Sequence, residues 1–253
     1  MSEYHFEYEP ARTGAMSPAE KRAARKNRGR VKGIVILDDS GSGSTYYYDL
    51  ATRHPIGARL KRAFDLLATT AVITAISPLL LLLMILIKAT SRGPIIFRQR
   101  RVGFRGNQFD MYKFRTMYDG AHLKEKELLA QSGKSFLKIK NDPRITPIGH
   151  FLRKYSLDEL PQLFNVLEGT MSMVGPRPLL QSDLDKLPRR APLSRFSTPP
   201  GITGLWQVSG RSDTSDAKRM QLDRQYVDQW SLALDFRILL QTVEVVFTGR
   251  GSS

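Results

Sequence analysis

The stretch LLATTAVITAISPLLLLLMILI, residues 66–87, contains no charged side chain and has a Ser77-Pro78 pair at its middle. A helix rises about 1.5 Å per residue, so the stretch is about 33 Å long, enough to cross a hydrocarbon core of about 30 Å. Proline inside a helix removes one backbone hydrogen bond and clashes with the preceding turn. The carbonyl of Thr74 is freed, and the hydroxyl of Ser77 or of Thr74 itself can donate to it. A membrane helix is therefore predicted that either spans with a kink or turns back.

The charges that flank this stretch favour a helix that turns back. Loops on the cytoplasmic side normally carry an excess of Lys and Arg. Here Lys61 and Arg62 precede the stretch, and Lys88 and Arg92 follow it. A spanning helix would place one basic cluster on the unfavoured side, whereas a re-entrant helix satisfies both flanks. Kinked spanning helices are common, so on the residues alone both alternatives stay open.

The chain as a whole is strongly basic. Its 253 residues carry a formal net charge of +15, which suits nucleic acid, an anionic membrane surface or phosphorylated substrates. It has no cysteine, which excludes disulfides and thiol-based metal sites. Residues 1–55 combine a basic cluster at 21–32 with a Gly/Ser run at 41–44. They are predicted to be a flexible N-terminal extension, either a solvated tail or a polybasic arm on anionic lipid.

The rest of the chain alternates strand and helix signals. Residues 95–101 and 109–117 are rich in aromatic and branched side chains and flank a glycine-containing turn, which predicts a β-hairpin. A charged helix is expected at 121–131. Two helices are predicted to follow near the end of the chain, at 216–229 and at 232–247, the second with one apolar stripe.

The densest group of chemistry-bearing residues is SLDELPQLFNVLEG at 156–169. Ser156 and Glu159 have the Ser-x-x-Glu spacing of a capping box before an apolar helix. Pro161 opposes that interpretation, because proline prefers the first helical position. A later helix start would leave Asp158 and Glu159 as adjacent carboxylates on the entry turn. There they would suit a divalent cation and an electrophile.

Taken together, these motifs resemble the bacterial sugar transferases of the monotopic phosphoglycosyl transferase family. The resemblance covers the chain from about residue 58 to the end, and several long motifs in the same order make it specific. The motifs are KRAFD at 61–65, YKFRTM at 112–117, SLDELPQLFNVL at 156–167, GPRP at 175–178 and PGITGLWQVSGR at 200–211.

The resemblance implies a helix-rich α/β fold with a small monotopic membrane catalytic domain. The catalytic domain would occupy residues 91–253 and include the β-hairpin and interfacial amphipathic helices. A re-entrant membrane helix at 56–90, broken at Ser77-Pro78, would anchor it. The implied location is the cytoplasmic face of the bacterial inner membrane, in contact with anionic lipids.

The activity that the resemblance implies is transfer of a sugar-1-phosphate from a UDP-sugar to undecaprenyl phosphate. UMP is released, Mg²⁺ is the cofactor, and the product begins exopolysaccharide, capsule or glycan assembly. A hexose, galactose or glucose, is expected because small members of this type often begin exopolysaccharide synthesis. The sequence fixes neither the sugar nor the oligomeric state, and a homo-oligomer stays open.

The Asp-Glu dyad of the family matches Asp158 and Glu159, which are expected to be the catalytic pair. An ordinary aspartate has a pKa of about 3.9, so Asp158 needs no base to attack at neutral pH. It would form a covalent phosphosugar intermediate in a ping-pong scheme, while Glu159, with Asp158 beside it, holds the metal. Basic side chains would take up the remaining phosphate charge. The candidates are Arg153, Arg177, Lys113 and Arg211.

Other interpretations of the same residues exist. Arg153 and Lys113 could be solvated surface charges, and Arg177 could brace a turn between prolines. A catalytically silent scaffold of the same fold is an alternative function, but it gives no reason for an intact dyad. A nucleic-acid-binding membrane protein would use the positive charge, but the chain has no helix-turn-helix, RNP or zinc signature. No nucleic-acid partner is therefore expected.

Overall fold

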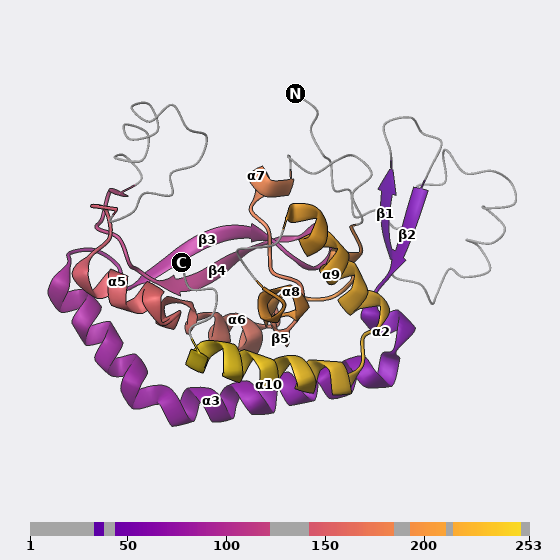
Figure 1. The fold of residues 1–253 in the computed structure, drawn as a ribbon, viewed down its shortest axis with the longest axis horizontal. Coiled ribbons are helices and arrows are strands. Elements are labelled where there is room, and N and C mark those ends of the chain that lie inside the picture. The colour runs from indigo at the N-terminus through magenta and orange to yellow at the C-terminus, as the bar shows by residue number, and fades with distance from the viewer. Residues whose placement is uncertain (1–32, 38–43, 122–141, 185–192, 211–214, 249–253) are drawn as a thin grey trace, which may run out of the picture.

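A long bent helix, α3 (Pro55–Thr90), lies along one side of the molecule, and shorter helices and small sheets lie on its concave side (Figure 1). The structure is a computed structural model. It describes residues 33–37, 44–121, 142–184, 193–210 and 215–248. Within these ranges the fold is helix-rich α/β, with three two-stranded sheets.

Helix α3 contains the apolar stretch and bends in its middle (Figure 1). Pro78 lies inside the helix and accounts for the bend, because proline cannot donate to the preceding turn. The hydroxyl of Ser77 donates to the carbonyl of Thr74 at 2.9 Å, which confirms the expected replacement bond. Of the helices described, α3 alone is long and apolar enough to cross a membrane, and 17% of its most apolar window is buried.

The N-terminal half of α3 is fixed to the rest of the protein by buried polar side chains. Lys61 pairs with Asp235. The carboxylate of Asp65 accepts hydrogen bonds from the hydroxyl of Ser172 at 2.7 Å and from the backbone N–H of Met173 at 3.1 Å. Arg62 donates to the carbonyl of Leu167 at the end of the neighbouring helix α6 (Gln162–Glu168). These contacts explain why the polar KRAFD motif stands directly before an apolar stretch.

The C-terminal half of α3 is fixed by apolar packing instead. Leu83 and Ile87 form one buried cluster with Phe114 and Leu152. Phe114 belongs to strand β4 (Gln108–Phe114) and Leu152 to helix α5 (Pro147–Lys154). The two halves of the bent helix are therefore docked separately, on either side of the bend.

The predicted β-hairpin is confirmed. Strand β3 (Ile96–Val102) pairs antiparallel with β4, and a short 3₁₀ turn, η1 (Phe104–Gly106), joins them. At this turn Arg105 has a φ of 57° and pairs with the buried Asp49. Within the predicted extension, β1 (Gly33–Leu37) and β2 (Ser44–Tyr48) form a second antiparallel hairpin, which the sequence did not indicate.

The third sheet is one parallel strand pair, β5 (Ser172–Val174) with β6 (Gly201–Thr203). Both predicted helices near the end of the chain are confirmed by α9 (Asp216–Asp228) and α10 (Leu232–Thr248). The helix expected at 121–131 falls, apart from Ala121, outside the described residues. The other elements are α2 (Leu50–Arg53), η2 (Leu157–Glu159), α6 (Gln162–Glu168), α7 (Gln181–Leu184), η3 (Leu193–Ser197), α8 (Leu205–Val208), α9 (Asp216–Asp228) and α10 (Leu232–Thr248).

An apolar surface remains uncovered on α3 and α10. On α3, Leu67 is 73% exposed and Ile85 57%, and on α10 both Phe236 and Leu240 are 58% exposed. The two helices meet at the buried Lys61–Asp235 contact. A large exposed apolar surface usually marks a contact with a membrane or with a protein partner.

Candidate active site

The acidic pair lies on the entry turn of α6. Ser156 has a left-handed backbone (φ 55°), and its side chain makes no capping bond, so the capping-box interpretation is wrong. Pro161 caps α6, which begins only at Gln162. Asp158 and Glu159 therefore occupy the separate 3₁₀ turn η2, as the alternative based on Pro161 predicted. The backbone of this turn directs them into a cavity.

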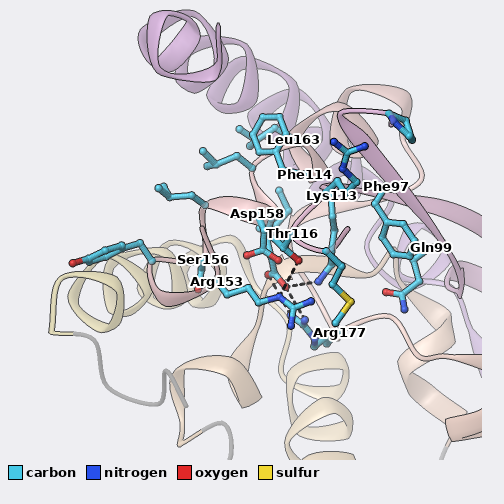
Figure 2. Close-up of a pocket in the computed structure, with 18 of the residues that line it drawn as sticks. Phe97, Gln99, Lys113, Phe114, Thr116, Arg153, Ser156, Asp158, Leu163 and Arg177 are labelled. Atoms are coloured by element: carbon cyan, nitrogen blue, oxygen red, sulfur yellow. Dashed lines mark hydrogen bonds and ion pairs between the residues drawn. The ribbon is translucent and has the colours of Figure 1, made fainter. Parts of the chain in front are cut away.

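This cavity has a volume of about 840 Å³ and brings the predicted site residues together. In Figure 2, Lys113 from β4, Arg153 from α5 and Arg177 from the Gly-Pro-Arg-Pro turn point towards Asp158. All three basic side chains line the cavity, as does Glu159. The fourth basic candidate, Arg211, lies outside the described residues.

Glu159 is held between two cations. The ammonium of Lys113 lies 2.9 Å from Oε1, and the guanidinium of Arg177 lies 2.8 Å from the same oxygen. Burial raises the pKa of this carboxyl, but Arg177 and Lys113 outweigh burial and hold the pKa well below its usual range. Glu159 is thus an anion throughout the physiological pH range.

Asp158 has the opposite electrostatic environment. Burial raises its pKa above the ordinary value; Lys113 and Arg153 oppose this rise, and the charge of Glu159 adds to it. Within the described residues, no other side chain donates a hydrogen bond to its carboxylate. Two adjacent carboxylates therefore differ: one is neutralised by ion pairs, and the other is desolvated and open to the cavity. Such separation of environments is common where paired carboxylates have different chemical roles.

The fold positions the side chains of Arg153 and Lys113. Arg153 donates from Nε to the hydroxyl of Thr116 at 2.9 Å, and burial lowers its pKa. The side chain of Lys113 is 17% exposed. The interpretation as a solvated surface charge is therefore wrong for Lys113, whereas Arg153 is an exposed residue whose guanidinium is held by Thr116.

Arg177 is supported from behind by a residue that sequence reasoning missed. Arg195 donates from Nη2 to the backbone carbonyl of Arg177 at 2.6 Å, and its guanidinium pairs with Asp223 at 3.0 Å. Both partners of that pair are buried. Arg195 lies in a proline-rich segment without a motif, so only the tertiary structure shows its connection to the site.

The two carboxylates are also the residues that could hold a metal. Among the described residues no group of three or more His, Cys, Asp or Glu side chains converges on one point. Mg²⁺ in phosphate chemistry is commonly bound by one or two carboxylates together with substrate phosphates. Asp158 and Glu159 fit such a substrate-completed site, although Lys113 and Arg177 share the oxygens of Glu159.

The chain belongs to the bacterial sugar transferase family, whose model matches residues 56–249. It is 43% identical over 204 residues to the exopolysaccharide production protein ExoY of Rhizobium meliloti, covering 78% of this chain and 90% of the relative. It is 44% identical over 200 residues to the undecaprenyl-phosphate galactose phosphotransferase of Salmonella typhimurium (76% and 41%). The undecaprenyl-phosphate glucose phosphotransferase of Komagataeibacter xylinus is 39% identical over 199 residues (73% and 35%).

These similarities confirm the resemblance seen in the motifs. The protein is a phosphoglycosyl transferase, and the family match covers both α3 and the cavity. The apolar helix α3 indicates that it is a membrane protein. The first fifty-five residues lie outside the matched region.

Proposed function

We propose that this protein transfers a hexose-1-phosphate from a UDP-sugar to undecaprenyl phosphate and releases UMP. The observation that carries the proposal is Asp158, a desolvated carboxylate open to a cavity whose wall is rich in basic side chains. The relatives named for galactose and glucose transfer to undecaprenyl phosphate support the hexose and the lipid acceptor. The relative named for exopolysaccharide production supports a role at the start of that pathway.

In the first half-reaction Asp158 acts as nucleophile. A carboxylate oxygen forms a bond to the phosphorus that bears the sugar, and the bond from that phosphorus to UMP breaks, so the phosphosugar becomes an acyl phosphate on Asp158. An anion must approach an anionic diphosphate in this step. Lys113 and Arg153 reduce that repulsion. The positive charges of both residues also lower the pKa of Asp158 and so favour its ionised form.

In the second half-reaction the phosphate of the lipid acceptor attacks the same phosphorus. The bond between phosphorus and Asp158 breaks, the carboxylate is regenerated, and the sugar is left on a lipid diphosphate. Dividing the transfer into two steps lets two bulky anions use one cavity in turn. A ping-pong kinetic pattern is the expected signature.

Glu159 keeps the basic side chains in the cavity when no substrate is present. Its ion pairs hold Lys113 and Arg177, so these cations need little reorganisation when a diphosphate arrives. We infer that Asp158 and Glu159 also hold Mg²⁺ together with substrate phosphates, where the metal would neutralise diphosphate charge.

Helix α3 is proposed to enter and leave the membrane through the cytoplasmic leaflet of the inner membrane. The bend at Pro78 and the basic residues on both flanks support this arrangement. The exposed apolar residues of α10 would lie at the same interface, with anionic lipids as neighbours. The cavity would then be within reach of a soluble donor and a lipid phosphate.

The test is UMP release by the purified full chain with Mg²⁺, undecaprenyl phosphate and either UDP-galactose or UDP-glucose. Wild-type protein should release UMP, and Asp158→Asn should abolish release. Asp228→Asn, a half-exposed aspartate on α9, is the matched control and should retain activity. Normal turnover by Asp158→Asn would show that Asp158 is not the nucleophile. No turnover by the wild type with any UDP-sugar would favour the silent scaffold.

A further inference from the structure

One buried cation in the cavity wall has no role in the mechanism above. Arg115 is 6% exposed, and its Nη2 donates to the backbone carbonyl and the hydroxyl of Ser91, each at 2.8 Å. Its Nε and Nη1 are buried without a hydrogen-bond partner. No ion pair joins it to a carboxylate in the part of the chain that the structure describes.

This lack of a counter-charge sets Arg115 apart from the other buried basic residues. Among the described residues that are similarly buried, Lys61, Arg144 and Arg195 each pair with an aspartate at 2.6 to 3.0 Å. Asp119, in the same cavity wall, accepts a bond from a neighbouring backbone N–H instead. A buried charge without a partner costs several kcal/mol, so the guanidinium of Arg115 needs a counter-charge that the described residues do not supply.

The strand places Arg115 on the same side as Lys113. The backbone N–H of Arg115 donates to the carbonyl of Ile95, which extends the hairpin pairing by one residue. Residues two apart on a strand face the same side and lie roughly 6.6 Å apart. Both side chains line the cavity that contains Asp158. Arg115 is therefore two residues along the chain from Lys113, which contacts Glu159.

The backbone around Arg115 leaves space for the guanidinium. Gly93 has a φ of +114°, and a Cβ at this position would clash with Nη1 of Arg115. The segment with Ser91 and Gly93 directly follows the end of α3. Arg115 thus lies where the proposed membrane helix returns to the catalytic domain.

We propose that Arg115, held by Ser91, forms a phosphate-binding subsite of the cavity, distinct from the Glu159 ion pairs. The ligand class is a phosphate ester, which rests on the proposed function. Two sources carry this group, the diphosphate of the UDP-sugar and the phosphate of the polyprenyl acceptor. Binding supplies the counter-charge that the guanidinium lacks among the described residues.

The first experiment uses inorganic phosphate as probe and needs no turnover. Thermal unfolding of the full chain in detergent is measured with and without phosphate, for wild type, Arg115→Met and Arg115→Lys. Phosphate should raise the Tm of the wild type, raise it less for Arg115→Met, and raise it by an intermediate amount for Arg115→Lys. Arg98→Met is the control, because Arg98 is exposed and does not line the cavity, whereas Phe97 and Gln99 on either side of it do. It should respond as the wild type does.

A structural brace would give a different result. If Arg115 only ties Ser91 to β4, Arg115→Met will unfold at a lower temperature but will keep the full phosphate-dependent rise. That outcome, or a wild-type protein that phosphate does not stabilise, overturns the proposal.

The second experiment identifies the source of the phosphate. UMP release without acceptor reports the donor half-reaction, and KM for each substrate is measured in full turnover. Arg115→Met should raise one KM at least about tenfold, since a charged hydrogen bond contributes that much to binding. A raised donor KM with a slower UMP burst assigns the UDP-sugar, and a raised acceptor KM with a normal burst assigns the lipid phosphate. Two unchanged KM values contradict the proposal, whereas an inactive wild type contradicts only the proposed function.

Discussion

The ammonium of Lys61 lies 2.6 Å from Oδ2 of Asp235, and this contact joins the first turns of α3 to α10 across 174 residues of sequence. Both side chains are 5% exposed. Asp235 also accepts bonds from the hydroxyl of Tyr226 at 2.8 Å and the indole N–H of Trp230 at 3.2 Å. The proposed membrane helix and the helix that ends the described chain are thus connected through one fully hydrogen-bonded buried carboxylate.

Removing one partner of this pair should destabilise the protein. Lys61→Met leaves Asp235 buried without its counter-charge, which costs about 3–5 kcal/mol. The measurement is urea unfolding of the full chain in detergent, compared with Lys218→Met at an exposed position on α9. The double variant Lys61→Met/Asp235→Asn should recover part of the loss. Equal stability of Lys61→Met and the wild type would show that the pair contributes nothing.

Asp158→Asn should make the protein inactive but more stable. Because burial raises the pKa of Asp158, its ionised form is less favourable in the folded protein than in the unfolded chain. The folded state bears this cost above both pKa values, and the cost disappears below the unfolded value of about 3.9. At pH 7 the variant should therefore show a higher Tm than the wild type. The difference in Tm between the two proteins, measured by scanning calorimetry, should become smaller as the pH is lowered. A lower Tm would mean that the carboxylate stabilises the fold.

The pH dependence of UMP release should follow Asp158 rather than Glu159. Release should fall as the pH drops through the raised pKa of Asp158, because only the carboxylate attacks, whereas Glu159 stays ionised. Lys113 lowers the pKa of Asp158, so Lys113→Met should move this acid limb to higher pH, whatever it does to the maximal rate. Lys218→Met should leave the limb in place. An unmoved limb in Lys113→Met would rule out this coupling.

Labelling can test the proposed re-entrant path. The chain has no cysteine, so Ser2→Cys and Ser253→Cys each provide a single thiol, one before and one after α3. Both should react with a membrane-impermeant reagent only from the cytoplasmic side, in inverted vesicles. If the two thiols react from opposite sides, α3 is an ordinary span.

Elements with a local sequence signal could be predicted, and long-range contacts could not. The β3–β4 hairpin and α10 follow from residue type and periodicity, and the Ser77–Thr74 bond follows from the chemistry of proline. The capping box at Ser156 failed because its local spacing was outweighed by Pro161.

The site residues illustrate the same limit. Asp158 and Glu159 were singled out by their adjacency, but only family resemblance pointed to Lys113 and Arg177 as their neighbours. Arg195 supports Arg177 through a backbone carbonyl, a contact that leaves no pattern in sequence. Tertiary contacts of this kind depend on packing that no window of neighbouring residues contains.

The two separate docking points of α3 have a consequence for how its apolar stretch can vary. Lipid would tolerate any uncharged residues of sufficient length, but Lys61 on one side of the bend and Ile87 on the other must each face the protein. Each residue turns a helix by about 100°, so inserting a single leucine between them would rotate one docking face away from its partner. The number of residues between the two docking points is therefore fixed by helix rotation as well as by membrane thickness. The apolar helix is a positioned part of the enzyme and not only a membrane anchor.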